Sequence, residues 1–472
     1  MKPYDLIIRN GLVASASEMG HWDIAVKDGK VAALGTALPD AAIEIDATGK
    51  IVLPGGVDAH CHLDEPTGGP ARMADDFRSG TLSAAFGGTT TVIPFARQMK
   101  GAGLAEAVED YHRRADGKAY IDYAFHMIIT DPSKAVLGEE LPRLIDAGYS
   151  SFKIYMTYDD LKLNDRQILE VLDTARQEQA LVMVHAENAD CIDFLTERLE
   201  ARGLTGPKFH AAARPPLVER EAVHRAVAYS ELVGQPILIV HVSGAEASAQ
   251  IAGFKARGLP VFAETCPQYL FLTKDDLDLR HFDGAKHICS PPPRTSADQQ
   301  EIWNGLRNGL FSVFSSDHAP FSFDSAEGKK VAGENAPFRK VPNGIPGLET
   351  RLPLLFSEGV GKNRIDLCRF VKLTSTNPAK IYGLFPRKGA LAVGSDADIT
   401  IWDPDRQVTI RNDLLHHNVD YTPYEGRTVT GWPETVISRG EIVIVKSQIA
   451  AEAGRGHFLP CARFEHWKDL RA

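Results

Sequence analysis

Apolar runs alternate with charged, helix-like segments eight times between residues 56 and 384. Such alternation is typical of repeated βα units, whose strands form a parallel sheet. The runs end near His62, Phe95, Ile129, Tyr155, His185, Val242, Glu264 and Ser316. Eight parallel strands are the number that closes a (β/α)8 barrel. The pattern therefore predicts an α/β protein with a TIM barrel over residues 56–384.

The two ends of the chain have a different texture. Residues 1–55 contain short strand-like runs separated by glycine turns, and strand-like runs return after residue 385 in DADITIWDP and ETVISRGEIVIV. Neither end alone has enough strands to bury both faces of a sheet. We therefore expect residues 1–55 and 385–472 to form one small β-sandwich domain with a C-terminal tail, beside the barrel.

Composition limits the partners of the chain. Its 472 residues carry a formal net charge of −10, which argues against nucleic acid or an anionic membrane as a partner. No apolar stretch approaches ~18 residues and the N-terminus lacks an apolar signal segment, so a cytoplasmic enzyme is expected. The six cysteines include no CxxC pair, so neither a zinc finger nor a disulfide framework is expected.

Six polar residues lie at the ends of these apolar runs. His60 and His62 are two residues apart, so their imidazoles point to the same side of a strand. Each alone has an ordinary explanation, such as a core histidine or an aspartate that caps a turn. Together, at the C-terminal mouth of a parallel barrel, they predict a metal site. The other four are Lys153, His185, His241 and Asp317.

Lys153 allows two interpretations. It stands between Phe152 and Ile154, and partial burial there would lower its pKa and favour the neutral amine. A neutral amine can add carbon dioxide to form a carbamate, whose two oxygens can bridge two metal ions. The alternative is a lysine whose ammonium group reaches solvent at the strand end.

The ligand types indicate the chemistry. Two divalent ions about 3.5–4 Å apart would lower the pKa of a bridging water and supply hydroxide at neutral pH, which implies hydrolysis. Imidazole, carboxylate and carbamate without thiolate suit zinc best, with manganese, cobalt or iron as alternatives.

The chain resembles the cyclic amidohydrolases of the dihydropyrimidinase and hydantoinase group over essentially its whole length. Strings that carry the resemblance include DAHCHLDEP, SFKIYMTYDD, VHAEN, VHVSG, AETCPQYL, SSDHAPF and PNGIPGLETRLP. The resemblance implies that one metal is held by His60, His62, carboxylated Lys153 and Asp317. It implies that the other is held by Lys153, His185 and His241, and that the chain forms a homotetramer.

The resemblance also implies roles in catalysis. Asp317 would carry a proton from a metal-bridging hydroxide to the leaving amide nitrogen. Tyr158 would donate a hydrogen bond to the oxyanion, and backbone groups of Ser290 and Asn343 would hold the ring amide. The implied reaction opens a dihydropyrimidine such as 5,6-dihydrouracil, or a 5-substituted hydantoin, to the N-carbamoyl amino acid.

The segment after His62 departs from the hydantoinase pattern. Leu63-Asp64-Glu65-Pro66-Thr67 stands where that pattern usually carries a methionine and an aromatic residue. The Glu-Pro pair is closer to allantoinases and dihydroorotases, but Asp64 occupies the place of the arginine expected in a dihydroorotase. Allantoin or another cyclic imide is therefore the second substrate hypothesis. A non-catalytic assembly protein of the same fold is a third, which the six filled ligand positions disfavour.

Overall fold

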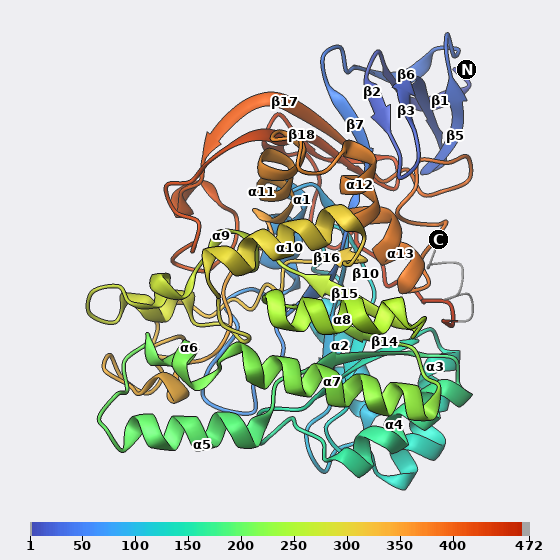
Figure 1. Ribbon diagram of the computed structural model, residues 1–472. Coiled ribbons are helices and arrows are strands. Elements are labelled where there is room, and N and C mark those ends of the chain that lie inside the picture. Colours follow the sequence, from blue (N-terminus) through green and yellow to red (C-terminus); the bar gives the residue numbers. More distant parts are fainter. Residues whose placement is uncertain (1, 465–472) are drawn as a thin grey trace.

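The computed structural model describes residues 2–464, and a closed parallel barrel forms its centre (Figure 1). The strand order is β10-β9-β11-β12-β13-β14-β15-β16, and β8 pairs with β9. The strands are β8 (Gly56–Cys61), β9 (Thr89–Arg97), β10 (Asp122–Tyr123), β11 (His126–Ile128), β12 (Ser151–Tyr155), β13 (Leu181–His185), β14 (Ile237–Ile239), β15 (Val261–Thr265) and β16 (Val313–Phe314).

Two details reconcile these nine strands with eight predicted runs. β10 and β11 both pair with β9 and are two pieces of one strand, interrupted at residues 124–125. The barrel closes where the segment after β16 meets β8. There the Asp317 amide donates to the His60 carbonyl at 2.8 Å, and the His62 amide donates to the His318 carbonyl at 2.7 Å. The predicted TIM barrel is confirmed.

Helices surround the barrel and cover the outer face of its strands (Figure 1). Several begin at a side-chain cap; Asn164, for example, accepts from the Gln167 amide at 2.9 Å. The helices are α1 (Phe77–Phe86), α2 (Leu104–Ala115), α3 (Leu141–Asp146), α4 (Asp165–Gln177), α5 (Ala189–Glu200), α6 (Phe209–Ala213), α7 (Pro216–Val233), α8 (Ala245–Ala256), α9 (Gln268–Phe271), α10 (Ser296–Asn308), α11 (Arg351–Leu355), α12 (Leu367–Val371) and α13 (Asn377–Ile381).

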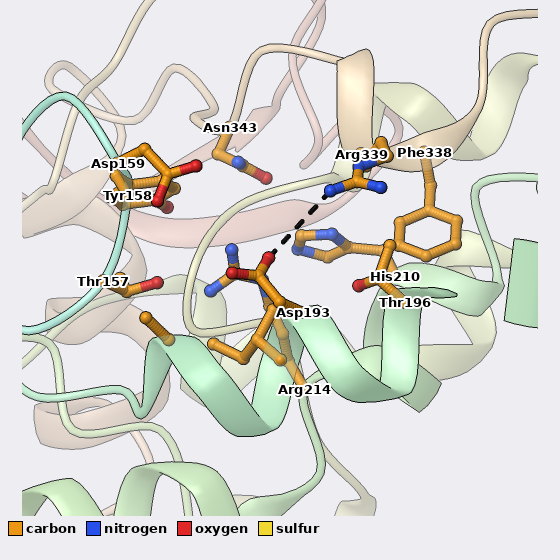
Figure 2. Close-up of a pocket in the computed structure, with 12 residues that line it drawn as sticks. Thr157, Tyr158, Asp159, Asp193, Thr196, His210, Arg214, Phe338, Arg339 and Asn343 are labelled. Atoms are coloured by element: carbon orange, nitrogen blue, oxygen red, sulfur yellow. Dashed lines mark ion pairs between the residues drawn. The ribbon is translucent and has the colours of Figure 1, made fainter. Parts of the chain in front are cut away.

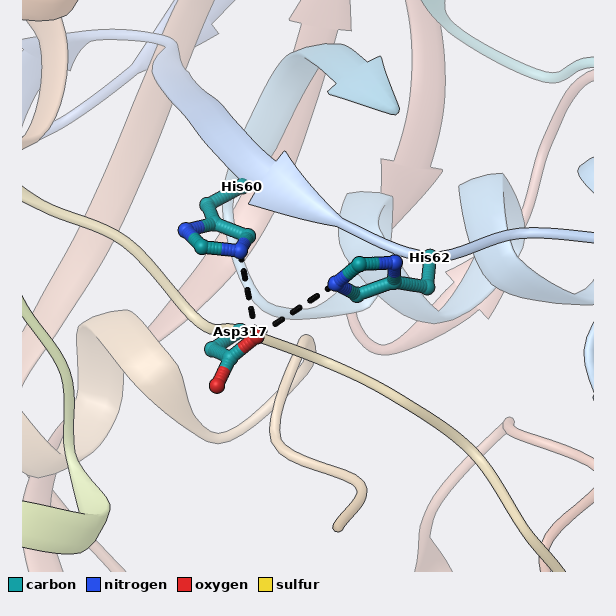
Figure 3. A group of neighbouring side chains, drawn as sticks. All are labelled: His60, His62 and Asp317. Carbon is teal, nitrogen blue, oxygen red and sulfur yellow. Dashed lines mark ion pairs between the residues drawn. The ribbon is translucent and has the colours of Figure 1, made fainter. Parts of the chain in front are cut away.

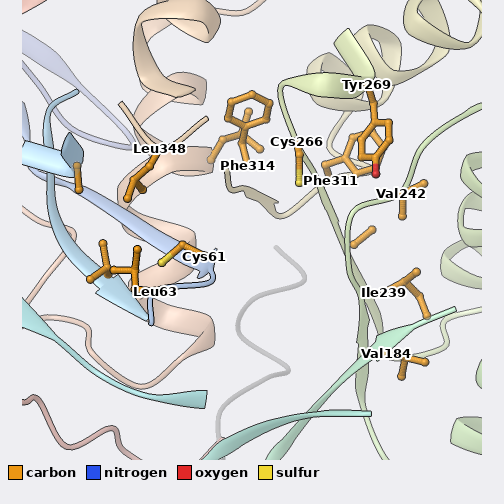
Figure 4. Packing of buried hydrophobic residues seen from close by; sticks show 14 of the residues in the cluster. Cys61, Leu63, Val184, Ile239, Val242, Cys266, Tyr269, Phe311, Phe314 and Leu348 are labelled. Carbon is orange, nitrogen blue, oxygen red and sulfur yellow. The ribbon is translucent and has the colours of Figure 1, made fainter. Parts of the chain in front are cut away.

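Barrel strands are buried on both faces, as parallel strands usually are. In β13, Val182 and Val184 pack in the layer between strands and helices, whereas Leu181 and Met183 pack inside the barrel. Figure 4 shows part of the outer layer, including Val184, with Cys61 among its residues. Cys61 thus packs in the core and does not face the space between His60 and His62.

Both ends of the chain build the β-sandwich, which confirms that prediction. One sheet has the order β5-β4-β1-β6, and the other has the order β20-β19-β18-β17-β7-β2-β3, where β17 pairs with β7. The strands are β1 (Tyr4–Arg9), β2 (Leu12–Ala14), β3 (Met19–His21), β4 (Asp23–Lys27), β5 (Lys30–Gly35), β6 (Ala41–Asp46), β7 (Ile51–Pro54), β17 (Ile399–Thr409), β18 (Thr428–Ser438), β19 (Glu441–Val445) and β20 (Gln448–Ile449). The domain boundaries at residues 55 and 385 stay a prediction.

The segment after β20 covers the N-terminal end of the barrel. The Leu459 amide donates to the Tyr123 carbonyl at 2.7 Å, and the Cys461 amide donates to the Gly148 carbonyl at 2.9 Å. Leu459 and Cys461 also pack with the residues inside the barrel. One end of the barrel is therefore closed, and the other remains for a site. Residues 465–472, the end of the predicted tail, lie outside the described residues.

Within residues 2–464, every helix is too short or too polar to cross a membrane.

Candidate metal centre and active site

The six predicted ligands converge at the C-terminal mouth of the barrel, and all six are buried. His60, Lys153 and His185 belong to β8, β12 and β13, while the others lie one to three residues after the ends of their strands. The distances are 2.8 Å from Lys153 Nζ to His60 Nε2, 3.2 Å from His60 Nε2 to Asp317 Oδ1, 3.5 Å from His62 Nε2 to Asp317 Oδ1, and 2.9 Å from His185 Nδ1 to His241 Nε2.

His60, His62 and Asp317 form a group that could hold a metal ion (Figure 3). One ligand atom from each lies within 4.8 Å of the other two. The figure shows the two imidazoles, from β8 and the residue just after it, pointing toward the carboxylate of Asp317 on the neighbouring segment. This arrangement follows from barrel closure, which places the segment after the last strand beside the first.

Carboxylates hold the outer nitrogens of three of the four histidines. His60 Nδ1 donates to Glu264 at 2.6 Å, His62 Nδ1 donates to Glu65 at 2.5 Å, and His185 Nε2 donates to Glu187 at 2.8 Å. Such partners fix the ring orientation and raise the basicity of the inward nitrogen. Each of these rings therefore directs its other nitrogen to the centre of the mouth, where the six residues meet.

Sequence reasoning did not assign this role to any of the three glutamates. Two of them are close in sequence to the histidine that they hold, since Glu65 is three residues after His62 and Glu187 is two residues after His185. That spacing was an available signal. Glu264 is 204 residues from His60, and only the polar end of an apolar run marked it.

The pKa shifts at the mouth of the barrel bear on whether its residues can bind a metal ion. Burial alone would raise the pKa of Asp317, but His60 and His62 outweigh it and lower the pKa to about 2. Burial lowers the pKa of Lys153, and no acid among residues 2–464 forms an ion pair with it. Burial also lowers the pKa of His60 and His241. Metal binding requires deprotonated ligands, and the environment of these four residues favours that form. For His62, burial would lower the pKa, but Glu65 and Asp317 outweigh it and raise the pKa.

Three candidate residues have a left-handed backbone, which is rare for residues other than glycine. The φ angles are 67° at Tyr158, 39° at His241 and 49° at Asp317. Such conformations cost on the order of 1–3 kcal/mol each and cluster at functional sites. Their joint occurrence indicates that strained backbone at the mouth orients these three side chains toward the cavity.

A cavity of about 370 Å³ opens above the six residues. Tyr158, Ser290 and Asn343 line it together with His62, Lys153 and Asp317, and Met73, Leu161, Phe321 and Val331 give it an apolar wall. The side-chain Oδ1 of Asn343 is buried without a hydrogen-bond partner among residues 2–464. An unpaired buried acceptor is costly unless a ligand satisfies it.

A smaller polar pocket of about 170 Å³ lies beside this cavity and shares Tyr158 and Asn343 with it (Figure 2). Arg214 at its base forms an ion pair with Glu187 at 2.8 Å and lies 5.3 Å from the centre of the Tyr158 ring. A chain of contacts therefore connects His185, through Glu187 and Arg214, with Tyr158. The sequence analysis did not identify Arg214.

Comparison with known proteins agrees with this fold and site. The model of the amidohydrolase family matches residues 51–443. D-hydantoinase of Rhizobium radiobacter is 45% identical over 455 residues, which are 96% of this chain and 98% of that protein. D-hydantoinase of Geobacillus stearothermophilus is 45% identical over 461 residues, which are 97% of each chain.

Solved structures give the same result. D-hydantoinase from Bacillus sp. AR9 superposes with a TM-score of 0.95 at 44% identity, covering 98% of this chain and 100% of that one. Dihydropyrimidinase from Brevibacillus agri NCHU1002 superposes with a TM-score of 0.94 at 43% identity, covering 98% and 99%. The barrel and its mouth are thus those of a hydrolase. The chain belongs to the amidohydrolase family, and its resemblance to the dihydropyrimidinase and hydantoinase group is confirmed.

Proposed function

We propose that the protein opens a cyclic ureide, either a 5-substituted hydantoin or a dihydropyrimidine such as 5,6-dihydrouracil, to the N-carbamoyl amino acid. The observation that carries this proposal is the convergence of six buried ligand atoms below a cavity that also contains an unpaired amide oxygen, on Asn343. Relatives named D-hydantoinase, similar over almost their whole length, support it.

Two divalent ions fit the donor set, with zinc as the first choice and manganese, cobalt or iron as alternatives. His60, His62, Lys153 and Asp317 would hold one ion, and Lys153, His185 and His241 the other. Lys153 would be carboxylated, which its burial and lowered pKa support. When bound, two such ions activate water and polarise a carbonyl group.

Asp317 is the proposed base and acid. Its lowered pKa keeps it ionised at neutral pH, so it can accept a proton from the attacking water and pass that proton to the leaving ring nitrogen. Its Oδ1 faces His60 and His62, while its Oδ2 lies 3.4 Å from the side-chain nitrogen of Gln268. These contacts hold the carboxylate at the floor of the cavity.

Tyr158 is the proposed donor to the oxyanion. Burial raises the pKa of its hydroxyl well above its usual range, so the hydroxyl keeps its proton at neutral pH and can donate. The backbone groups of Ser290 and Asn343 are proposed to bind the ring of the cyclic substrate. A cyclic ureide has alternating C=O and N–H groups along one edge, which paired backbone donors and acceptors can match.

The variable ring substituent would lie against the apolar wall of the cavity. Arg97 and Asp160 lie at its rim, joined by an ion pair of 2.5 Å. Allantoin or another cyclic imide is the second candidate, because residues 63–67 depart from the usual hydantoinase pattern and their Glu65-Pro66 pair is closer to allantoinases. Since the Glu65 carboxylate is held by His62, the replacement does not require a different ring, and hydantoin or dihydrouracil stays first.

We also propose a homotetramer, as the family resemblance implies. Large apolar side chains are exposed on the helical layer, namely Phe194 on α5 and Leu217 and Leu232 at the two ends of α7, with exposed fractions of 57%, 51% and 75%. Such residues favour burial against another subunit. Sedimentation of the purified protein would measure the assembly directly, and a monomer would contradict this part of the proposal.

The test of the function is metal content together with ring-opening rates on four compounds: dihydrouracil, a 5-substituted hydantoin, allantoin and succinimide. About two ions per chain and fastest opening of dihydrouracil or the hydantoin are expected. Two ions with a preference for allantoin or succinimide would make the second candidate correct. A protein without metal and without turnover would contradict the proposal and support the assembly protein of the same fold.

A further inference from the structure

Lys329 is completely buried, yet no acidic side chain among residues 2–464 forms an ion pair with it. Its ammonium group donates instead to two backbone carbonyls, that of Ile288 at 2.8 Å and that of Pro342 at 2.7 Å. Burying a cation without a counter-charge is costly, and burial lowers the pKa of Lys329 to about 7. A methionine would fill a similar volume without this cost, so stability alone does not explain the lysine.

The two carbonyls belong to the segments that carry Ser290 and Asn343. Ile288 is two residues before Ser290, and Pro342 directly precedes Asn343. The Ile288 carbonyl also accepts from the Gly344 amide at 3.0 Å. Lys329 therefore connects two cavity walls that are far apart in sequence. Its two hydrogen bonds add to the backbone bond between Gly344 and Ile288, which also joins these walls.

The loop before Lys329 is built to direct this side chain inward. The Lys329 amide donates to the Ser322 carbonyl at 2.8 Å, and a Cβ at Gly328 would lie 1.9 Å from the same carbonyl oxygen. Only glycine therefore allows this close turn. The next residue points outward, since Lys330 forms ion pairs with Asp324 and Glu334 at 2.7 and 3.3 Å.

We propose that Lys329 is a positioning residue for ring recognition, which sets the spacing between the backbone groups of Ser290 and Asn343 and so tightens binding of the cyclic substrate. This inference rests on the proposed function. Binding groups must be held within about 0.5 Å of the productive geometry. Without the ammonium group, the Ile288 and Pro342 carbonyls lose a shared donor, and the two walls are joined less firmly. Lys329 does not touch the reacting atoms, so the chemical step is expected to be unaffected.

The charge of Lys329 gives a pH signature that a passive core residue would lack. The ammonium form dominates below about pH 7 and the neutral amine above it. The hydrogen bonds from Lys329 to the Ile288 and Pro342 carbonyls therefore lose their charge and weaken as the pH rises. The titratable groups that face it are those of Cys289, His287 and His210. Burial raises the pKa of Cys289 far above neutrality and lowers the pKa of His287 to about 4 and of His210 to about 3. A change of KM near pH 7 that depends on Lys329 is therefore its own.

The experiment compares K329M and K329Q with the matched control K330M, using KM, kcat and metal content on the best ring substrate from pH 6 to 8.5. K329M should raise KM about 5- to 150-fold at pH 6, the range that corresponds to ~1–3 kcal/mol for an unsatisfied buried group. Its kcat and metal content should stay within about twofold of the unchanged protein. K329Q keeps N–H donors without the charge and should lie between the two, and K330M should match the unchanged protein.

KM of the unchanged protein should rise between pH 6 and 8.5, whereas KM of K329M should be high throughout. An unchanged KM in both Lys329 variants would overturn the inference, and so would a parallel loss of kcat, metal and KM in K329Q, which would mean a general structural role. If the unchanged protein opens none of the rings, the proposed function fails and the inference fails with it. If the unchanged protein opens rings but both Lys329 variants have the same KM as the unchanged protein, the inference alone is wrong.

Discussion

Two buried lysines occupy opposite ends of the barrel, and their surroundings differ. Lys153, at the mouth, and Lys388, where the sandwich meets the N-terminal end, are each 1% exposed. Lys388 contacts the carboxylates of Asp122, Asp398 and Asp396 at 2.7, 2.8 and 3.2 Å. Burial opposes its charge, but these carboxylates outweigh burial and raise its pKa. For Lys153, burial prevails and lowers the pKa.

Burial alone therefore does not define the role of a lysine. Where carboxylates surround it, the lysine is a cation that joins elements. Asp122 begins β10 of the barrel, and Asp398 directly precedes β17 of the sandwich, so Lys388 connects the two parts of the fold. Where acids are turned away to hold histidines, as Glu264 and Glu65 are, the lysine can be a neutral amine suited to chemistry.

The largest expected effect belongs to the mouth. D317N should lower kcat by about 10²- to 10⁴-fold, because an amide cannot carry the proton. The free energy of unfolding should change little by comparison, which denaturant titration would measure beside the steady-state rate. A near-normal rate would mean that another group acts as the base.

At the other end, K388M should destabilise the protein without affecting chemistry. Removing the cation leaves the buried Asp398 carboxylate without an ion pair among residues 2–464, which costs about 3–5 kcal/mol. Asp122 and Asp396 each lose one partner but keep another, Arg439 and Lys30. Denaturant unfolding should show the loss, while kcat and metal content of the folded protein remain unchanged. If kcat fell and stability did not, the contrast between the two lysines would be wrong.

Y158F should lower kcat by about 10²-fold or more, since one donor to the oxyanion is lost. Steady-state kinetics on the best ring substrate would measure this. A change confined to KM would instead make Tyr158 a residue that positions the substrate.

The smallest expected effect is on metal affinity. E65Q should weaken metal binding by about 10-fold, because the amide still accepts from His62 but carries no charge. Titration with a competing chelator would measure it. D160N is the matched control at the same cavity, since Asp160 contacts Arg97 and none of the histidines. Equal affinities in E65Q and the unchanged protein would show that the Glu65 charge does not support the site.

Much of the fold could be predicted because its signals are local. Each barrel strand is a short apolar run, and the six mouth residues lie at the ends of five such runs, because His60 and His62 share one. Lys153 and His241 could therefore be assigned to one site although they are 88 residues apart in sequence. The break within the third strand, at residues 124–125, could not be foreseen, because the apolar pattern continues through it.

The rest depends on contacts that no local pattern encodes. The partner of His60 is Glu264, and the partners of Lys388 include Asp122, 266 residues away. Lys329 meets Ile288 and Pro342 only because a long loop folds back over the mouth. These contacts arise from barrel closure and loop conformation, which periodicity does not describe.

The metal content of K153M, measured beside that of K388M, tests whether Lys153 belongs to the metal centre. About two divalent ions per chain are expected in the unchanged protein and in K388M. K153M should lose most bound metal and its ring opening while it retains its stability. If K153M kept two ions and its turnover, Lys153 would be a buried lysine without a part in the metal centre.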